Sequence, residues 1–396
     1  MTRLLLLLGL AACGTAATSS VDCTTLAAAV PAGRGELEGI WDGPRQRLLL
    51  FGGNEAIPEN CAVGATDLLD DLWAFHTACE AFGEVQVKGD KPSARARAAV
   101  GHDTTRQQLV LHGGRFRAGD SGAYTVRKDT WVLDLATDTW RKLKGEGPPA
   151  RFDHVGAVFG DRFVIWGGND STDGAVIAPR NDVWVLDLAT ESWSKLTTKG
   201  NPVPRTYAAA AADDGHLYVF GGGGSDALVG SFMADLWSLD VATGSWTELH
   251  DGSGKAPRGR IWADLVHDAE RDRLLLWAGH DDGELGNTNQ IWAFGLGTGK
   301  WTQVREGDVH NQPANGFCDF PADFTLVDPE SPERREAGVA VWAEGELMIF
   351  GGKADCGNLD DVWTYDPAAD VWTERSRATS GEVCPRIGGT CSSMCF

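Results

Sequence analysis

An all-β propeller of six four-stranded blades is the fold that the sequence predicts, and three observations lead to it. The stretch Asp182 to Trp193, DVWVLDLATESW, recurs in varied form in five further copies, and a second aromatic residue always follows the first by nine positions. An apolar run that ends in a pair of small residues, such as LLLFGG, precedes each copy. Neighbouring copies begin at least 53 residues apart, which fits the roughly 50-residue repeat that builds one propeller blade.

Each element of the repeat has a physical reason. The apolar runs, for example residues 163–166, predict second strands that neighbouring blades cover on both faces. The glycine pairs that follow let the chain turn where a Cβ atom would clash. Short segments such as DLATDTW predict turns between the third and fourth strands, each closed by a hydrogen bond to an Asp side chain. These aspartates are Asp134, Asp187, Asp240 and Asp366. Small residues, as in Ala208 to Ala212, suit the innermost strand, where the blades converge.

The combination of a strand closed by Gly-Gly, a variable loop, D-x-W and a second Trp resembles the kelch motif, over roughly residues 34–372. The first aromatics of the copies are Trp73, Trp131, Trp184, Trp237, Trp292 and Trp363, and the second are Phe82, Trp140, Trp193, Trp246, Trp301 and Trp372. The resemblance implies a kelch-type propeller of the galactose oxidase/kelch-like class, at residues 34–383. Six blades are favoured by the count of complete motifs, with seven as the alternative if the two termini together build a small last blade.

The two ends of the chain carry separate expectations. Residues 1–12 have one Arg and a short apolar run, which is typical of an export signal. Leu10-Ala11-Ala12-Cys13 resembles a bacterial lipobox, which implies that Cys13 carries lipid and that residues 13–33 form a tether and closure segment. We therefore expect a protein of the bacterial cell envelope, lipid-anchored in the outer membrane. An ordinary cleaved signal and a secreted protein remain the alternative. Residues 384–396 are expected to form a closure strand tied by disulfides.

Nine cysteines form an odd set, and assigning Cys13 to lipid leaves eight to pair in an oxidising compartment. Strand parity places Cys318 and Cys356 on one face of the predicted blade six, so we expect a disulfide between them. The same argument pairs Cys61 with Cys384 and separates Cys61 from Cys79, because a strand of about six residues at ~3.3 Å each lies between them. The pairing of Cys23, Cys79, Cys391 and Cys395 stays open. No zinc pattern matches the cysteine spacing, and no metal site is expected.

The net charge of −21 makes nucleic acid and anionic lipid surfaces poor partners. Contact with a membrane is therefore expected through the lipid anchor only, and the protein is expected to be a monomer. Because consecutive strands alternate in direction, the long loops and the blade-entry segments should share one end of the propeller. A rigid scaffold that carries variable loops is typical of a binding protein. The residues expected to bind a ligand at this face are Arg97, Arg151, Arg205, Arg258, Arg335, Tyr124 and Phe232.

Catalytic motifs are mostly absent. The sequence has no H-E-x-x-H, no G-x-S-x-G and no phosphate-binding glycine loop, and its four tyrosines include no Tyr-His pair of the kind the copper radical oxidases need. No cofactor is expected, and Asp153 with His154 is the one acid/base pair considered. The function favoured is a binding module for a protein or carbohydrate ligand. An enzyme acting on an acidic sugar and a structural envelope protein without a small ligand are the alternatives. The sequence does not separate ligand classes or periplasmic from surface-facing orientation.

Overall fold

The computed structural model describes residues 21–26, 29–56, 67–119, 121–174, 176–227, 230, 232–281, 286–310, 325–354 and 357–379. Three short 3-10 helices occur in these ranges, at Cys23–Thr25, Gly43–Arg45 and Ala269–Arg271, and the other regular elements there are β-strands. None of the described helices has the length and apolar character needed to cross a bilayer.

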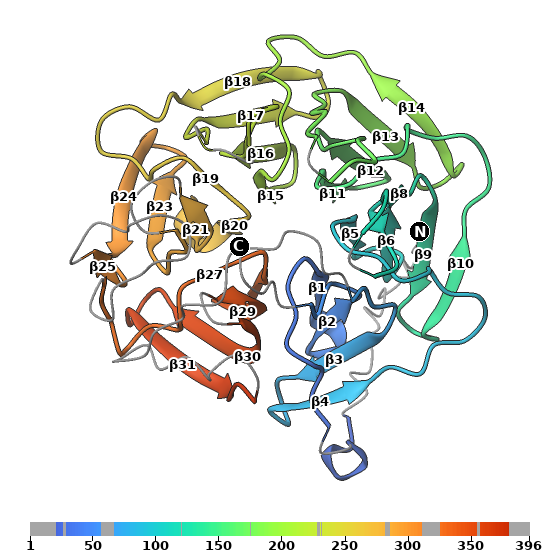
Figure 1. The fold of residues 1–396 in the computed structure, drawn as a ribbon, viewed down its shortest axis with the longest axis horizontal. Coiled ribbons are helices and arrows are strands. Elements are labelled where there is room, and N and C mark those ends of the chain that lie inside the picture. Colours follow the sequence, from blue (N-terminus) through green and yellow to red (C-terminus); the bar gives the residue numbers. More distant parts are fainter. Residues whose placement is uncertain are drawn as a thin grey trace, which may run out of the picture.

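Six antiparallel sheets form a ring around a central axis, as Figure 1 shows. Blades one to three contain β1 (Glu38–Asp42), β2 (Arg47–Phe51), β3 (Leu72–His76) and β4 (Ala81–Glu84); β5 (Ala99–Asp103), β6 (Gln108–His112), β9 (Thr130–Asp134) and β10 (Thr139–Lys142); and β11 (Val155–Phe159), β12 (Arg162–Trp166), β13 (Val183–Asp187) and β14 (Ser192–Leu196). Within each blade the strands follow one another from the axis outward, so each blade is a meander of consecutive strands.

Blades four to six repeat this order. They contain β15 (Ala209–Ala212), β16 (His216–Phe220), β17 (Leu236–Asp240) and β18 (Ser245–His250); β20 (Asp264–Asp268), β21 (Arg273–Trp277), β23 (Ile291–Gly295) and β24 (Lys300–Arg305); and β28 (Val339–Ala343), β29 (Glu346–Ala354), β30 (Gly357–Asp366) and β31 (Val371–Ser376). Short pairs of strands decorate the ring: β7 (Arg115–Phe116) with β8 (Thr125–Val126), β19 (Arg260–Ile261) with β22 (His280–Asp281), β25 (Val309–His310) with β26 (Thr325–Leu326), and β27 (Arg335–Glu336) with β29.

The prediction of six four-stranded blades is confirmed. The innermost strand of blade one, β1, contacts both β5 of blade two and β28 of blade six, so the first and last blades are direct neighbours. No space for a seventh blade lies between them, which excludes the alternative count. Each of the six sheets takes its four blade strands from one continuous part of the chain. The predicted closure strand at 384–396 lies outside the described residues.

Apolar second strands form the core of the ring, because each lies between two other strands of its own sheet and between two neighbouring blades. Phe163, Val164 and Ile165 in β12 have no exposed surface. The pair of small residues after each second-strand apolar run, Gly-Gly in five blades and Ala278-Gly279 in blade five, has positive φ. A Cβ on Gly114 would approach the carbonyl oxygen of Ala96 to 2.9 Å. Asp187 accepts hydrogen bonds from the backbone N–H groups of Ala189 and Thr190, which closes the β13–β14 turn as the sequence predicts.

The two ends of the propeller differ. On one end, which we call the long-loop face, each blade-entry segment pairs with the start of the loop between second and third strands, for example Ala96 with Arg115, Phe152 with Asn169 and Thr206 with Gly223. On the other end, the turn face, lie the tight turns that join first to second and third to fourth strands. This arrangement agrees with the strand parity expected from the sequence. Blade six has no long loop between its second and third strands, because β29 and β30 extend and pair up to Ala354 and Gly357.

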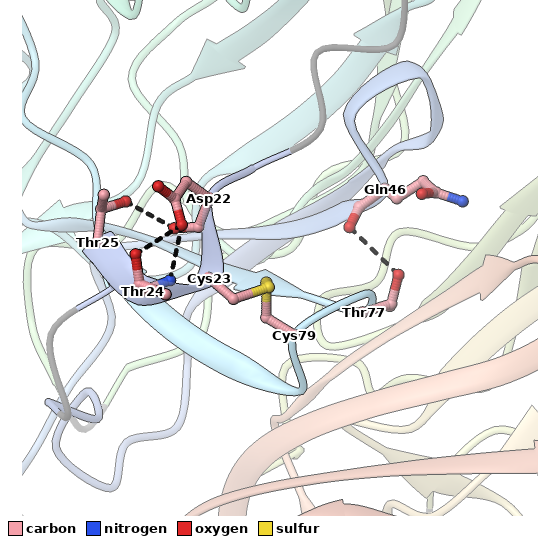
Figure 2. Close-up of a disulfide and its surroundings, with 7 residues drawn as sticks. All are labelled: Asp22, Cys23, Thr24, Thr25, Gln46, Thr77 and Cys79. Carbon is pink, nitrogen blue, oxygen red and sulfur yellow. Dashed lines mark hydrogen bonds between the residues drawn. A yellow bond between two sulfur atoms is a disulfide. The ribbon is translucent and has the colours of Figure 1, made fainter.

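A disulfide joins Cys23 to Cys79, with 5.6 Å between the Cα atoms. Figure 2 shows that Cys79 lies in the β3–β4 turn, so the bond fastens the segment before blade one at the turn face. Leu26 of this segment approaches Gly83 of β4, whose Cβ would lie 3.0 Å from the Leu26 side chain. Cys23 and Cys79 both belong to the set whose pairing the sequence left open. The pairs Cys318–Cys356 and Cys61–Cys384 lie outside the described residues and stay predictions.

Candidate functional site on the long-loop face

A buried arginine fastens every blade at its entry. The guanidinium of Arg95 donates to Asp129 at 2.8 Å and to the carbonyl of Gly113 at 2.9 Å, and Asp129 also accepts the indole N–H of Trp131. Burial by itself raises the pKa of Asp129, but the hydrogen bond and charge of Arg95 outweigh it and lower that pKa. The Asp of D-x-W is therefore an anchor for Arg and Trp.

The same Arg–Asp–Trp unit recurs around the ring. Its other members are Arg34 with Asp71 and Trp73, Arg151 with Asp182 and Trp184, Arg205 with Asp235 and Trp237, and Arg335 with Asp361 and Trp363. In blade five Gln290 replaces the Asp and accepts hydrogen bonds from Arg260 and Trp292. Each of these arginines lies four residues before its first strand, and a proline stands three residues before each arginine.

This unit separates the seven residues that were expected to bind a ligand into two groups. Arg151, Arg205 and Arg335 are each only 1 % exposed and use their guanidinium groups within their own blades. Their geometry is that of structural fasteners, and they have no free hydrogen-bonding side towards the axial opening among the contacts described. Arg97 and Arg258 lie two residues away from the true equivalents, Arg95 and Arg260. The side chain of Arg258 is exposed, and its backbone carbonyl accepts a hydrogen bond from Nε of Arg260 at 3.2 Å.

A second ring of residues, which we call the axial ring, follows two positions after the buried arginines. Its members are Glu36, Arg97, Asp153, Tyr207, Trp262 and Ala337, and each has a positive φ between 51° and 61°. Side chains other than glycine rarely adopt this conformation, and such residues gather at functional sites. Backbone hydrogen bonds between neighbouring blades stabilise this conformation. The N–H of Arg97 donates to the carbonyl of Glu36 at 3.0 Å, and the N–H of Asp153 donates to the carbonyl of Arg97 at 2.9 Å. Similar bonds join Trp262 to Tyr207, Ala337 to Trp262 and Glu36 to Ala337.

Charged side chains of the axial ring form a compact network around the axis. Arg97 donates from Nε to Glu36 at 2.6 Å and from a terminal nitrogen to Asp153 at 3.0 Å. Lys353 of β29 also pairs with Glu36. Burial opposes the charge of Arg97, but the two carboxylates raise the pKa of Arg97 well above its ordinary value. Burial raises the pKa of Asp153 despite its contact with Arg97.

Aromatic side chains flank this network on two sides. The guanidinium of Arg97 lies 4.8 Å from the ring centre of Trp262, which packs on Tyr207. Phe232 joins Tyr207 and Trp262 in a cluster with Ile177, Ala227 and Ile261. Burial is the main reason why the pKa of Tyr207 rises to about 12.

On the other side, Arg115 of β7 lies between the rings of Tyr124 and Phe152, at 4.2 and 4.9 Å, and reaches Glu36 at 3.4 Å. Arg117 lies over the same Tyr124 ring at 4.4 Å. Three of the seven expected residues, Arg97, Tyr124 and Phe232, therefore meet at or beside the axial ring. Each of these stacked contacts is of the cation–π type.

Sequence reasoning missed Glu36, Tyr207, Trp262, Arg115 and Lys353 as members of the site. The signal that could have found the axial ring is the pattern P-x-x-R, which opens every blade. The residue two positions after this Arg is the member of the axial ring. Pro92 and Pro257 would have identified Arg95 and Arg260 as the buried arginines and so set the register. Arg115 and Lys353 follow the Gly-Gly pairs of blades two and six, where no repeat pattern distinguishes them.

The acid/base pair considered from the sequence does not form in the described structure. Asp153 bonds to Arg97, whereas His154 is buried between blades two and three with its ring 5.6 Å from that of His112. Both ring nitrogens of His154 lack a hydrogen-bond partner in the described residues. No group of three or more His, Cys, Asp or Glu side chains in the described ranges is arranged to hold a metal ion.

A closed ring of six four-stranded blades, each fastened by one Arg, one acidic or amide residue and one Trp, defines a β-propeller built from a single sequence repeat. The chain belongs to the kelch-repeat family: residues 40–267 and 223–396 match the KLHDC2/KLHL20/DRC7 Kelch-repeats domain. Propellers of this family are protein-interaction modules.

Curated relatives share the repeat at low identity. The chain is 26% identical to Kelch domain-containing protein 3 of Bos taurus over 320 residues, which cover 76% of this chain and 75% of the relative. It is 27% identical to Kelch domain-containing protein 10 of Xenopus tropicalis, over 63% of this chain and 56% of the relative. Host cell factor 2 of Homo sapiens is 29% identical over 56% of this chain and 28% of its own length.

Proposed function

We propose that this propeller binds a protein partner on its long-loop face, at the axial ring and the β7–β8 hairpin, through a segment that carries an acidic and an apolar residue. The observation that supports this most is the arrangement of Arg97, Arg115 and Arg117 against aromatic rings in a protein whose net charge is −21. Arginine and aromatic side chains are the residues that dominate binding energy in protein interfaces.

The surface offers two kinds of contact side by side. The hairpin presents the partly exposed guanidinium of Arg117, which stacks on Tyr124 beside the buried Arg115, and a preorganised arginine binds carboxylates with little loss of side-chain entropy. Phe232 and Trp262, which are partly buried and pack against Tyr207, offer apolar area for a neighbouring side chain. The backbone of the axial ring is fixed by its own hydrogen bonds, so binding requires little reorganisation.

A selection experiment tests this function. The full chain with Cys13 replaced by serine is screened against a displayed random-peptide library and against a glycan array. We expect enriched peptides with an acidic residue near an aromatic or aliphatic one, and Trp262→Ala should weaken their binding at least about tenfold, the effect of a typical interface anchor. Binding of glycans without peptides would favour the carbohydrate alternative, and peptide binding that Trp262→Ala leaves unchanged would refute the location.

We further propose that the protein is exported and held at a membrane by lipid on Cys13. The Cys23–Cys79 disulfide supports export, because such bonds persist in oxidising compartments. Cys23 lies ten positions after Cys13, a reach of at most about 35 Å. An anchor there holds the turn face towards the membrane and leaves the long-loop face pointing away. Metabolic labelling with a palmitate analogue tests it, since Cys13→Ser should abolish the label. The bacterial outer membrane remains the compartment expected from the lipobox resemblance.

A further inference from the structure

A pocket of about 220 Å³ opens on the turn face, where blade six meets blade one. Phe75, Met348 and Thr364 are buried residues of its lining, and Glu80, Glu344 and Glu346 bring three carboxylates to it. Gln46 and Thr77, also part of the lining, are joined by a hydrogen bond that Figure 2 shows. The pocket is far from the axial ring along the strand direction, because it lies at the opposite ends of the same blades.

The seam between blades one and two shows how a side chain of the second strand fills the corresponding place there. Asp42, the last residue of β1, stands opposite Arg47, the first residue of β2. The Nε atom of Arg47 lies 2.8 Å from the Asp42 carboxylate. Arg47 is buried and continues across the seam to blade two, where it donates to the carbonyl of Leu135 at 3.0 Å and to Asp138 at 3.2 Å. An arginine side chain therefore closes that seam. Asp268 and Arg273 of blade five form the same pair at 2.9 Å.

Blade six carries neither half of this pair. Ala343 ends β28 and pairs in register with Glu346, the first residue of β29, so these two occupy the positions of Asp42 and Arg47. The acceptor across the seam is still present. Glu80 stands at the end of the β3–β4 turn with φ 46°, as Asp138 stands at the end of the β9–β10 turn with φ 51°. The seam thus keeps the carboxylate but has Glu346 instead of an arginine at the first position of its second strand.

Arg375 of β31 compensates only part of the negative charge. It donates from Nε to Thr364 at 3.0 Å and reaches Glu80 at 3.3 Å and Glu346 at 3.4 Å, so its guanidinium lies along one wall. Glu344 accepts one hydrogen bond from the Gln46 amide, at 3.0 Å. Three carboxylates against one guanidinium leave an excess of two negative charges over an apolar floor.

From this comparison we propose that the pocket between blades six and one, the seam pocket, binds a guanidinium or ammonium group on a short alkyl stem. The cation takes the place that Arg47 fills in the neighbouring seam, with its charge on Glu80 and Glu344 and its stem on Phe75 and Met348. The pocket is smaller than the roughly 300–1,000 Å³ of sites for drug-sized ligands, so it suits a ligand the size of one side chain. A free alkyl cation and an arginine side chain of a partner share this chemistry.

Titration of the full chain with n-butylguanidinium, followed by saturation-transfer NMR, tests the site. Binding should exceed that of n-butanol, which has the same stem without charge, and that of butyrate. The double variant Ala343→Asp/Glu346→Arg restores the pair of blade one and should abolish binding. Glu80→Gln removes one exposed carboxylate and should weaken binding about tenfold, the effect of losing a charge-assisted hydrogen bond. If the double variant does not fold, the binding measured with Glu80→Gln tests the site by itself.

Equal binding of butanol, or butylguanidinium binding that survives both variants, would overturn the proposal, as would the absence of any binding by the wild type. A parallel titration with N-acetyl-arginine amide separates the two sources. Stronger binding of this peptide-like form indicates an arginine of a partner, and stronger binding of butylguanidinium indicates a free cation. Trp262→Ala on the long-loop face should leave the titration unchanged, so the seam pocket and the protein-binding surface are tested independently.

Discussion

Arg97 and Glu36 lie 61 positions apart in the chain, yet the Nε atom of Arg97 is 2.6 Å from a carboxylate oxygen of Glu36 at the axis of the propeller. The contact joins the entry of blade two to the entry of blade one, and the backbone bond between the same two residues lies directly beside it. At this point the hydrogen-bonded backbone of the axial ring and its charged side chains meet on the long-loop face.

Replacing Arg97 by methionine should destabilise the fold by about 3–5 kcal/mol, because removing one partner of a buried ion pair leaves an uncompensated charge. Here Asp153 loses the guanidinium to which it bonds, whereas Glu36 keeps its contacts with Lys353 and Arg115. Urea unfolding measures the loss. The matched variant Arg141→Met, at an exposed arginine of β10 that is paired with Glu191, should cost less than about 1 kcal/mol. Equal losses in the two variants would contradict a buried network.

The buried pair His112 and His154 predicts acid sensitivity. Burial is the main cause that lowers the pKa of His112 to about 3, with Arg151 and Arg95 adding to it and Asp129 opposing it. Burial, with His112 and Arg151, also lowers the pKa of His154 well below its ordinary value. In the unfolded chain these histidines bind protons below about pH 6.5, whereas in the folded chain they stay neutral. The free energy of unfolding is therefore unaffected by them above about pH 6.5 and falls as the pH drops from there towards about 3.

His112 should contribute a slope of about 1.4 kcal/mol per pH unit in that window, and His154 should steepen it. Urea melts between pH 7 and pH 4 measure it, and His112→Gln should reduce the slope. A slope unchanged by this variant would mean that His112 is already charged or exposed.

The second aromatic of each repeat should be structural, with a graded cost. Trp246 is 6 % exposed and packs on Trp166, so Trp246→Ala should cost about 3–5 kcal/mol, the usual effect of deleting a buried large aromatic. Trp193 is only partly buried, although it donates to Thr130 and contacts the ring of Phe163. Trp193→Ala should therefore cost less than Trp246→Ala in the same urea melts. The reverse order would show that the blade-three edge is covered more than the structure indicates.

Non-reducing peptide mapping tests the remaining cysteine pairs. We expect peptides that join Cys23 to Cys79, Cys318 to Cys356 and Cys61 to Cys384. The last two rest on strand parity alone. A peptide that joins Cys61 to Cys79 would contradict both this parity and the observed bond.

The fold could be predicted because the repeat is local: apolar strand, Gly-Gly, D-x-W and Asp turn all fall within one blade. The site could be predicted only in part. Arg97 and Arg95 both fit a blade-entry arginine in the sequence, and the loop between Arg95 and its partner Asp129 is of variable length in the repeat, so the spacing to D-x-W does not set the register. The contacts of Arg97 with Glu36 and Trp262 come from three different blades and arise only when the ring closes.

The central claim, that the long-loop face is the binding surface, is tested most directly by the affinity of a selected peptide for two variants of blade two. Arg117 lies over Tyr124 in the long-loop hairpin, and Arg141 lies on the outer strand β10. We predict that Arg117→Ala weakens peptide binding about tenfold or more while Arg141→Ala leaves it within twofold of the wild type, as expected for an interface anchor and a residue outside the interface. Equal affinities for Arg117→Ala and the wild type, or a larger loss for Arg141→Ala, would contradict it.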